Sequence, residues 1–303
     1  MSYDRRDFPN RITVELTNRC NVDCTFCPRQ HISMTLGDMT KNLFFDIVNE
    51  ASNHLPVSMV LFFRGESLLH EHFLEFIRYA KSKGIYPVQI ATNALLLDEN
   101  MQNALIDAEI DFLSVSLDTN SADKYAKSRK GGDLEVSKKN LIRFCEKCKQ
   151  KRLAGIKSPE IQVSTVDIEE YRNEKDVFID FWRKHTDIVR VYMEHSSDGN
   201  MGSVNGASIN STLRKPCMKV YTDMVIYWDG TVALCNHDWD NNLNIGYIGS
   251  SSIYDVWNGD TYENIRKMHE SGNFNNSIVC KSCDHWFSYY TDKGFLGELY
   301  KNK

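Results

Sequence analysis

The segment "RITVELTNRCNVDCTFC", residues 11 to 27, joins a strand-like run to three closely spaced cysteines. The run from 11 to 17 is rich in β-branched and apolar side chains and predicts a strand. Cys20, Cys24 and Cys27 follow it directly. Thiolates at this spacing can wrap one face of a metal centre, but a tetrahedral metal normally takes four ligands. The segment therefore predicts a metal site whose fourth ligand has to be found.

Two kinds of centre fit this spacing. Zinc would need one more protein ligand, and His31 is close enough in sequence to supply it. An iron–sulfur cluster is the other choice, because clusters are held by closely spaced cysteine thiolates. With three irons bound by protein, the fourth iron of a [4Fe–4S] cluster would stay open to an external ligand. The spacing by itself leaves both choices open.

Composition and charge exclude several classes of protein. The 303 residues are 42% hydrophobic and 25% charged, which is ordinary for a globular chain. The formal net charge of -5 provides no basic footprint, so no nucleic-acid partner is expected. The start "MSYDRRDFPNR" lacks a signal-peptide core, and no apolar run is long enough to span a membrane. We expect a cytoplasmic protein with no membrane partner.

The nine cysteines are odd in number and form three groups along the chain. An odd count fits poorly with a complete disulfide framework and favours reduced, metal-binding thiols. The first group is described above. Cys145 and Cys148 form the middle group, and Cys217, Cys235, Cys280 and Cys283 form the last.

Strand-like and helical patterns alternate over the first two-thirds of the chain. The predicted strands are 11–17, 58–63, 87–92, 112–118, 161–166 and 189–194, and the predicted helices are 39–51, 70–84, 98–109, 133–152 and 174–186. This alternation predicts a parallel α/β sheet built from right-handed crossovers. Periodicity does not decide between an open sheet and part of a barrel. In both, the site lies at the C-terminal ends of the strands.

The last third predicts a smaller unit. A polar, Gly-rich stretch at 196–211 reads as a linker or long loop. In "YTDMVIYWDGTVALC", residues 221–235, Asp229 and Gly230 separate two apolar runs and predict a hairpin. A helix is expected from about 252 to 270. Two of the last cysteines flank the hairpin and two follow the helix as Cys-x2-Cys, a layout that also suits a zinc ribbon.

Four segments resemble the radical S-adenosylmethionine (SAM) enzymes. The family hallmark Cys-x3-Cys-x-aromatic-Cys is matched by the first three cysteines with Phe26 at the aromatic position. "FFRGES" (62–67), "ATNALLL" (91–97) and "SVSLD" (114–118) resemble the motifs after strands two and three and on strand four. The chain departs from the family at Arg64, where glycine is common, and at Ser67, where proline is common.

This resemblance implies a fold, cofactors and an activity. The fold is a partial (βα)6 TIM-like barrel with a small C-terminal hairpin and helix module. The open iron of the [4Fe–4S] cluster would chelate SAM, and the reduced cluster would cleave it to a 5′-deoxyadenosyl radical that abstracts a substrate hydrogen. A flavodoxin- or ferredoxin-type protein would donate the electron. Gly65 and Glu66 would contact the methionyl amino end, with Asn93, Ser116 and Asp118 near the ribose or methionyl part. Taken singly, each could instead be a turn former or cap.

The last four cysteines resemble those of the auxiliary-cluster module called twitch and of its longer SPASM relative. The resemblance implies one auxiliary [4Fe–4S] cluster with four cysteine ligands, suited to electron transfer because no iron is open. It divides the chain into a radical SAM core at 1–200 and an auxiliary domain with a tail at 201–303. The spacing is most similar to dehydrogenases of the butirosin type, which oxidise an aminocyclitol alcohol to a ketone.

The middle cysteines bear on the choice of reaction. With Leu141, Cys145 and Cys148 form one apolar helix face and are expected to pack against the sheet. No spare thiol then remains to return a hydrogen atom, which disfavours epimerisation. We expect oxidation of a small molecule: a sugar, an aminocyclitol or a nucleotide-linked sugar. The candidate bases are His237, Asp238 and Glu194, and Arg190 is a candidate anion contact.

Three alternatives remain: a radical SAM epimerase, a peptide-modifying maturase and a zinc-binding interaction module. The peptide reading is disfavoured because strand one begins near residue 11 and leaves no room for an N-terminal peptide-recognition domain.

Overall fold

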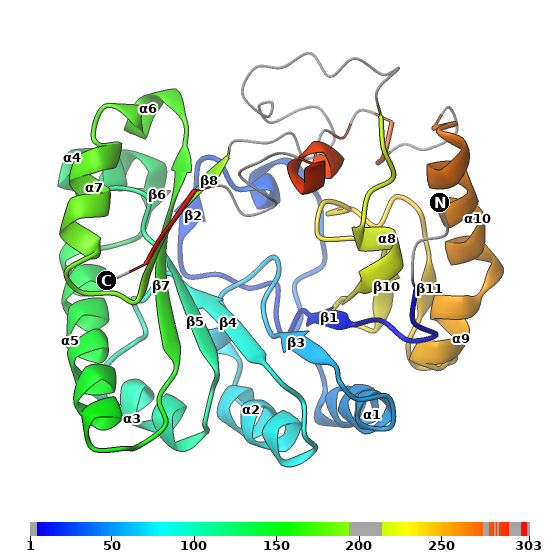
Figure 1. Cartoon of the computed structure of the whole chain (residues 1–303), viewed down its shortest axis with the longest axis horizontal. Coiled ribbons are helices and arrows are strands. Elements are labelled where there is room, and N and C mark those ends of the chain that lie inside the picture. The colour runs from blue at the N-terminus through cyan, green and yellow to red at the C-terminus, as the bar shows by residue number, and fades with distance from the viewer. Residues whose placement is uncertain are drawn as a thin grey trace.

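The computed structural model of the chain describes residues 5–193, 214–274, 279–281, 283, 285–290 and 298–301. Its centre is a ten-stranded sheet in the order β11-β10-β9-β1-β3-β4-β5-β7-β8-β12 (Figure 1). Six adjacent strands are parallel to their neighbours: β1 (Arg11–Val14), β3 (Ser58–Val60), β4 (Val88–Thr92), β5 (Phe112–Ser116), β7 (Glu160–Asp167) and β8 (Ile188–Met193). These are the six strands that the sequence predicts.

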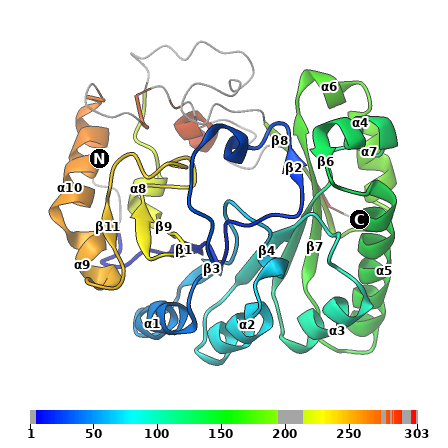
Figure 2. The same ribbon diagram turned by 180° about the vertical axis from the view of Figure 1, so that it is seen from behind.

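Helices cover the outer side of this curved sheet, as Figures 1 and 2 show from opposite directions. The predicted helices are α1 (Lys41–Ser52), α2 (Phe73–Ser82), α3 (Glu99–Asp107), α5 (Leu134–Leu153) and α7 (Lys175–Trp182). Two short helices, α4 (Ala122–Ser128) and α6 (Glu169–Arg172), were not predicted, because they are too short for a periodic pattern. The partial barrel is thereby confirmed.

Amphipathic patterns explain why the helices pack this way. Helix α1 starts at an N-cap, where the Thr40 side chain accepts a hydrogen bond from the Leu43 N–H. Its buried residues are Phe44, Ile47, Val48 and Ala51, which recur at helical spacing. Helix α5 buries Cys145 and Cys148 in the main core, as predicted.

The C-terminal hairpin extends the same sheet. Strands β9 (Asp223–Ile226) and β10 (Thr231–Ala233) are antiparallel and turn at Gly230, which has a φ of +94°. Strand β9 pairs in parallel with β1, and β11 (Gly246–Tyr247) adds to the other side of β10. The sequence pattern predicts the turn of the hairpin, but it does not identify β1 as the strand with which β9 pairs.

The remaining elements complete the edges of the molecule. They are β2 (Asp23–Cys24), β6 (Arg129–Lys130), β12 (Glu298–Lys301), α8 (Lys219–Thr222), α9 (Ile253–Asn258), α10 (Asp260–Ser271) and the 3-10 turns η1 (Pro28–His31), η2 (Ser67–Leu69) and η5 (His285–Tyr290). The single helix expected over 252–270 is two helices, because Gly259 between α9 and α10 is extended (ψ 164°). From the C-terminal tail, β12 pairs with β8 and covers that edge of the sheet.

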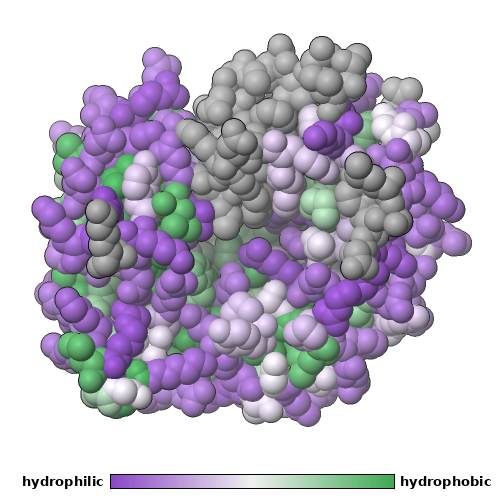
Figure 3. Space-filling view, viewed as in Figure 1, coloured by the Kyte–Doolittle hydropathy of each residue, from purple (hydrophilic) through white to green (hydrophobic). Residues whose placement is uncertain are grey.

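The sheet runs without a break from the first strands into the last third of the chain. The predicted domain boundary near residue 200 lies outside the described residues and stays a prediction. On the face shown in Figure 3, hydrophobic side chains form small separate patches among hydrophilic ones. Within the ranges given above, no helix is long and apolar enough to cross a membrane.

Candidate functional site

The first cysteine group lies in the loop after β1, held by a short two-stranded pairing. Strands β2 and β6 pair Cys24 with Arg129, and the Cys27 N–H donates to the Cys24 carbonyl at 3.0 Å. Burial raises the pKa of all three thiols, that of Cys24 to about 11. Thiolates at Cys20 and Cys27 would raise the pKa of Cys24 further, so the sulfur atoms lie near one another. A cationic metal centre fits here, because it would stabilise the ionised thiolates. The His31 side chain, the zinc alternative's fourth ligand, lies outside the described residues.

Arg129 joins this loop to the end of β5. Its Nε donates to the Asp118 carboxylate at 3.0 Å, and its Nη2 donates to the same oxygen. Both side chains are buried. The guanidinium lies 5.6 Å from the Phe26 ring centroid, a cation–π contact. Sequence reasoning missed Arg129, because the β2–β6 pairing that brings it to the cysteines leaves no periodic signal.

Gly65, Glu66 and Asn93 lie in contact at the ends of β3 and β4. A Cβ at Gly65 would clash with the carbonyl oxygens of Thr17 and Arg19. The Glu66 carboxylate accepts the Asn93 N–H at 2.9 Å, and burial raises the pKa of that carboxyl. The structure therefore brings together three of the predicted SAM contacts at the same ends of the strands as the cysteine loop.

Asn93 also ties the end of β4 directly to the cysteine loop. Its Nδ2 donates to the Asn21 side-chain oxygen at 2.7 Å. Asn21 follows Cys20 in the chain. The fourth predicted contact, Ser116, ends β5 in register with Ser164 of β7.

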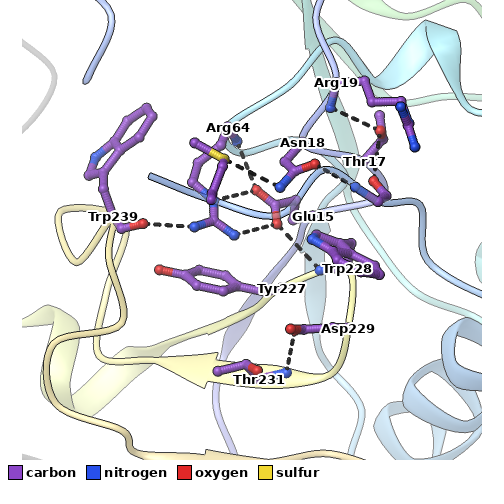
Figure 4. A network of polar contacts seen from close by, with 12 residues as sticks. Glu15, Thr17, Asn18, Arg19, Arg64, Tyr227, Trp228, Asp229, Thr231 and Trp239 are labelled. Atoms are coloured by element: carbon purple, nitrogen blue, oxygen red, sulfur yellow. Dashed lines mark hydrogen bonds and ion pairs between the residues drawn. The ribbon is translucent and has the colours of Figure 1, made fainter. Parts of the chain in front are cut away.

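Arg64, one of the two departures from the family pattern, forms a buried network shown in Figure 4. Its Nε and Nη2 donate to the two oxygens of Glu15 at 2.7 and 2.8 Å. Its Nη1 donates to the Trp239 carbonyl at 2.7 Å, and its Cζ lies 3.6 Å from the Tyr227 ring centroid. Glu15 also accepts the Trp228 N–H at 3.3 Å. One arginine thus joins the ends of β1 and β3 to the hairpin and to the loop after Cys235.

A polar wall, defined here as Ser114, Gln162, Arg190 and Tyr192, lines the inner face of β5, β7 and β8. The residues that alternate with them are apolar and pack in the core with α5 and α7, so these four face away from the helices. Gln162 Nε2 donates to Ser114 at 2.9 Å and to Tyr192 at 3.3 Å, and Arg190 Nε donates to Gln162 at 3.2 Å. The sequence signal that could have identified these residues is the alternation of polar and apolar side chains along the three strands. Parallel strands that are buried on both faces are usually continuous apolar runs, so this alternation indicates a polar inner face.

The last four cysteines line one shared cavity. Its other lining residues include His237, His269, His285, Arg214 and Lys219. Burial raises the pKa of Cys217 to about 12 and that of Cys235 well above its usual value. Thiolate sulfur suits iron–sulfur clusters and zinc, so the donor set fits an auxiliary cluster. In the part of the chain that is described, no three Cys, His, Asp or Glu side chains are arranged around a single metal ion; the thiols instead surround this larger space.

The candidate bases and the candidate anion contact lie in different parts of the structure. His237 lines the cysteine cavity, with its ring 4.1 Å from that of His285. The Asp238 carboxylate accepts the N–H groups of Leu234 and Asn242 at 3.3 and 2.8 Å, so it organises the loop after Cys235. Arg190 belongs to the polar wall on β8. Glu194 lies outside the described residues.

Family models match two parts of the chain. The model described as the Radical SAM superfamily covers residues 14–157. The SPASM model, an iron–sulfur cluster-binding domain, covers residues 217–284 and so includes the last four cysteines.

Two curated relatives each match less than half of the chain. A tungsten-containing aldehyde ferredoxin oxidoreductase cofactor-modifying protein of Pyrococcus furiosus is 33% identical over 35% of this chain and 30% of its own length. A GTP 3′,8-cyclase of Lactiplantibacillus plantarum is 34% identical over 44% of this chain and 40% of its own length. The chain therefore spans less than half of the length of each of these two relatives.

A solved structure matches almost the whole chain. The crystal structure of BtrN in complex with AdoMet and 2-DOIA covers 96% of both chains with a TM-score of 0.61 and 19% identity. At this identity the likeness shows a shared fold and no more.

Proposed function

Because the chain carries a radical SAM domain and a SPASM iron–sulfur domain, we propose that it oxidises a small polar molecule and passes one electron to the auxiliary cluster. The domains imply SAM, a [4Fe–4S] cluster and auxiliary iron–sulfur as cofactors. When bound and reduced, the first cluster and SAM supply a 5′-deoxyadenosyl radical that abstracts a hydrogen atom.

The first three cysteines would hold the SAM-binding cluster. Gly65 lets the chain pass close to the carbonyl groups of Thr17 and Arg19 and so fixes the position of Glu66. The buried Glu66 carboxylate suits the SAM amino group, while Asn93 connects that position to the cysteine loop. These roles are supported by the contacts among the residues at the strand ends.

The observation that carries the proposal is the convergence of four thiols on one buried cavity. Four cysteine ligands would leave no iron of a [4Fe–4S] cluster open, which favours electron transfer over substrate binding. The fold likeness to BtrN is consistent with this reading.

The polar wall supports a polar substrate. Ser114, Gln162 and Tyr192 present hydroxyl and amide groups, and Arg190 adds a cation that would suit a phosphate. A sugar, an aminocyclitol or a nucleotide-linked sugar carries complementary groups.

The oxidation balances in three parts. The radical would take the hydrogen atom from a carbon bearing a hydroxyl or amine, and a base would take the proton from that hydroxyl or amine. A cluster held by Cys217, Cys235, Cys280 and Cys283 would accept the remaining electron. The base remains a proposal among His237, Asp238 and Glu194. The two backbone hydrogen bonds to Asp238 favour a structural role for that carboxylate. A flavodoxin- or ferredoxin-type donor is proposed for the first reduction.

Anaerobic turnover tests the proposal. The holoenzyme, SAM and a reductant are incubated with a panel of aminocyclitols, sugars, nucleotide-linked sugars and GTP, and the products are identified by mass spectrometry. We expect deoxyadenosine together with a product lighter by two hydrogen atoms. A product of unchanged oxidation level, from GTP or from an epimerised substrate, would overturn the oxidation.

Matched cysteine variants test the auxiliary ligands. Wild-type protein should contain about eight irons per chain, and Cys217→Ala about four, with SAM cleavage kept but oxidised product lost. Cys148→Ala is the control, because its thiol is buried on α5 and does not line the four-cysteine cavity, and it should keep the full iron content. Stoichiometric zinc in wild-type protein would instead support the interaction module.

A further inference from the structure

We propose that His269 donates a hydrogen bond from its Nε2 to a sulfur of the auxiliary cluster and so raises the reduction potential of that cluster. The proposal rests on the auxiliary cluster of the proposed function. It makes His269 a positioning and tuning residue that the sequence patterns do not single out. His269 lies on α10, near its C-terminal end.

Hydrogen bonding fixes which nitrogen carries the proton. The Cys217 backbone N–H points at His269 Nδ1 with an N···N distance of 3.2 Å. A backbone N–H can only donate, so Nδ1 must offer its lone pair. In the neutral ring the hydrogen is therefore on Nε2. The same ring thus holds the backbone of a cysteine ligand with one nitrogen and has a donor on the other.

That donor has no acceptor among the described residues. His269 is 2% exposed, and its Nε2 is buried without a hydrogen-bond partner in the part of the chain that is described. The ring packs at an interplanar angle of 78° on Phe274, with ring centroids 4.9 Å apart, and lines the four-cysteine cavity. Buried N–H groups are normally paired, so an unpaired one on the wall of a cofactor cavity points to the cofactor as its acceptor. Cluster and cysteine sulfur atoms would supply that acceptor.

Two cations line the same cavity. Arg214 is held by the carbonyl oxygens of Cys280 and Lys281, and by the ring of Phe274 at 3.8 Å. Lys219 donates to the Asn236 side chain next to Cys235. Reduction adds one negative charge to a cluster with four thiolates. Hydrogen bonds and positive charges stabilise that added charge, which raises the potential and favours electron flow from the substrate to the cluster.

Two variants of His269 distinguish the role of Nδ1 from that of Nε2. His269→Asn keeps an acceptor near the position of Nδ1 for the Cys217 N–H but removes the donor. His269→Gln reaches further and places an amide N–H near the position of Nε2. A purely structural role, bracing the Cys217 backbone, predicts that the Asn variant behaves like wild type.

The potential of the auxiliary cluster is measured in the holoenzyme by a redox titration followed by EPR, with the SAM-bound cluster identified by its response to SAM. At the wild-type midpoint we expect the ratio of reduced to oxidised cluster to fall about tenfold in His269→Asn, which equals about 59 mV for one electron. His269→Gln should stay within about threefold of wild type. An unchanged Asn variant, or equal shifts in both variants, would overturn the proposal.

A measurement on wild-type protein keeps the test independent of variant folding. Pulsed EPR of the reduced auxiliary cluster, in protein labelled with 15N-histidine, should show coupling to an imidazole nitrogen that His269→Gln removes. Absence of this coupling in wild-type protein would contradict the hydrogen bond. None of these readouts uses substrate, so a failed oxidation assay with a shifted potential would remove the proposed reaction and leave this inference standing.

Discussion

At the scale of single residues, the site beside the first three cysteines depends on a close approach of two backbone segments as well as on thiols. Gly65 is the sharpest example, because its neighbours on the β1 loop are carbonyl groups that have little freedom to move. Only a residue without a Cβ lets the loop after β3 pass there. Glu66 then reaches the amide of Asn93.

We predict that Gly65→Ala abolishes measurable SAM binding and lowers the free energy of unfolding by about 2 kcal/mol or more, since backbone must shift to admit the methyl group. Isothermal titration with SAM and urea denaturation provide the two readouts. Gly155→Ala is the control. Its added Cβ would meet nothing within 4 Å, but its φ of +73° is strained for alanine. It should cost about 1 kcal/mol and leave SAM binding intact. Normal SAM affinity in Gly65→Ala would contradict the role given to this glycine.

At the scale of elements, Asp111 organises the junction before β5. Its carboxylate accepts the Val88 N–H at 2.9 Å, Lys81 Nζ at 2.5 Å and Lys157 Nζ at 2.9 Å. Burial alone would raise the pKa of Asp111, but the hydrogen bonds from Lys81 and Val88 outweigh it and hold the pKa below its usual value. One carboxylate thereby joins α2, β4 and β5 at the end of the barrel opposite the site.

Asp111→Asn should lower the free energy of unfolding by about 1–3 kcal/mol at pH 7. Because the folded pKa is depressed, the contribution is complete above the unfolded pKa and is lost as pH falls through the folded value. The difference between variant and wild type should therefore shrink towards acid pH in urea titrations. Glu135→Gln, an exposed carboxylate on α5, should change stability by less than about 0.5 kcal/mol. A constant difference at all pH values would show that packing, not charge, is lost.

At the scale of the whole molecule, β1 lies between β3 of the barrel and β9 of the hairpin. The buried Glu15–Arg64 pair lies at the end of β1 and contacts both sides. Arg64 also precedes Gly65 and Glu66 in the chain, so the same residue that anchors the hairpin fixes the start of the predicted SAM-binding loop. We infer that this pair sets the position of one cysteine site relative to the other.

Arg64→Met should destabilise the fold by about 3–5 kcal/mol, because it leaves the Glu15 carboxylate buried without its partner. The double variant Glu15→Leu with Arg64→Met should recover part of that loss, which a double-mutant cycle in urea would measure. Arg152→Met is the control, since its pair with Asp187 is more exposed and contributes at most about 1 kcal/mol. If the double variant loses the sum of both single losses, the two side chains are not coupled.

Much of the fold was predictable because its signals are local. Each of the six parallel strands and five principal helices coincides with a run or a periodic pattern of apolar residues in the sequence. The Asp229–Gly230 turn also lies where the sequence predicts it. The errors have physical reasons. Gly259 interrupts one helix, and α4 and α6 are too short to show a period. The pairing of β12 with β8 depends on an exposed sheet edge that only the folded barrel creates.

The sequence predicted the cysteine ligands of the site, but it did not predict several of the residues that surround them. The cysteine spacings indicated two metal centres, and the comparisons confirm a radical SAM domain and a SPASM domain. Arg129, His269 and the polar wall were missed. Arg129 and His269 meet the cysteines through contacts between segments far apart in the chain, which leave no local pattern.

By itself, the sequence from "RITVELT" to "CTFC" determined a strand followed by three thiolates, because strand propensity and ligand spacing are properties of neighbouring residues. The tertiary structure alone decided what surrounds them. It placed Arg129 beside Cys24, Arg64 between barrel and hairpin, and His269 on the wall of the four-cysteine cavity. The physical reason is that burial and hydrogen bonding between distant segments exist only once the sheet has closed around them.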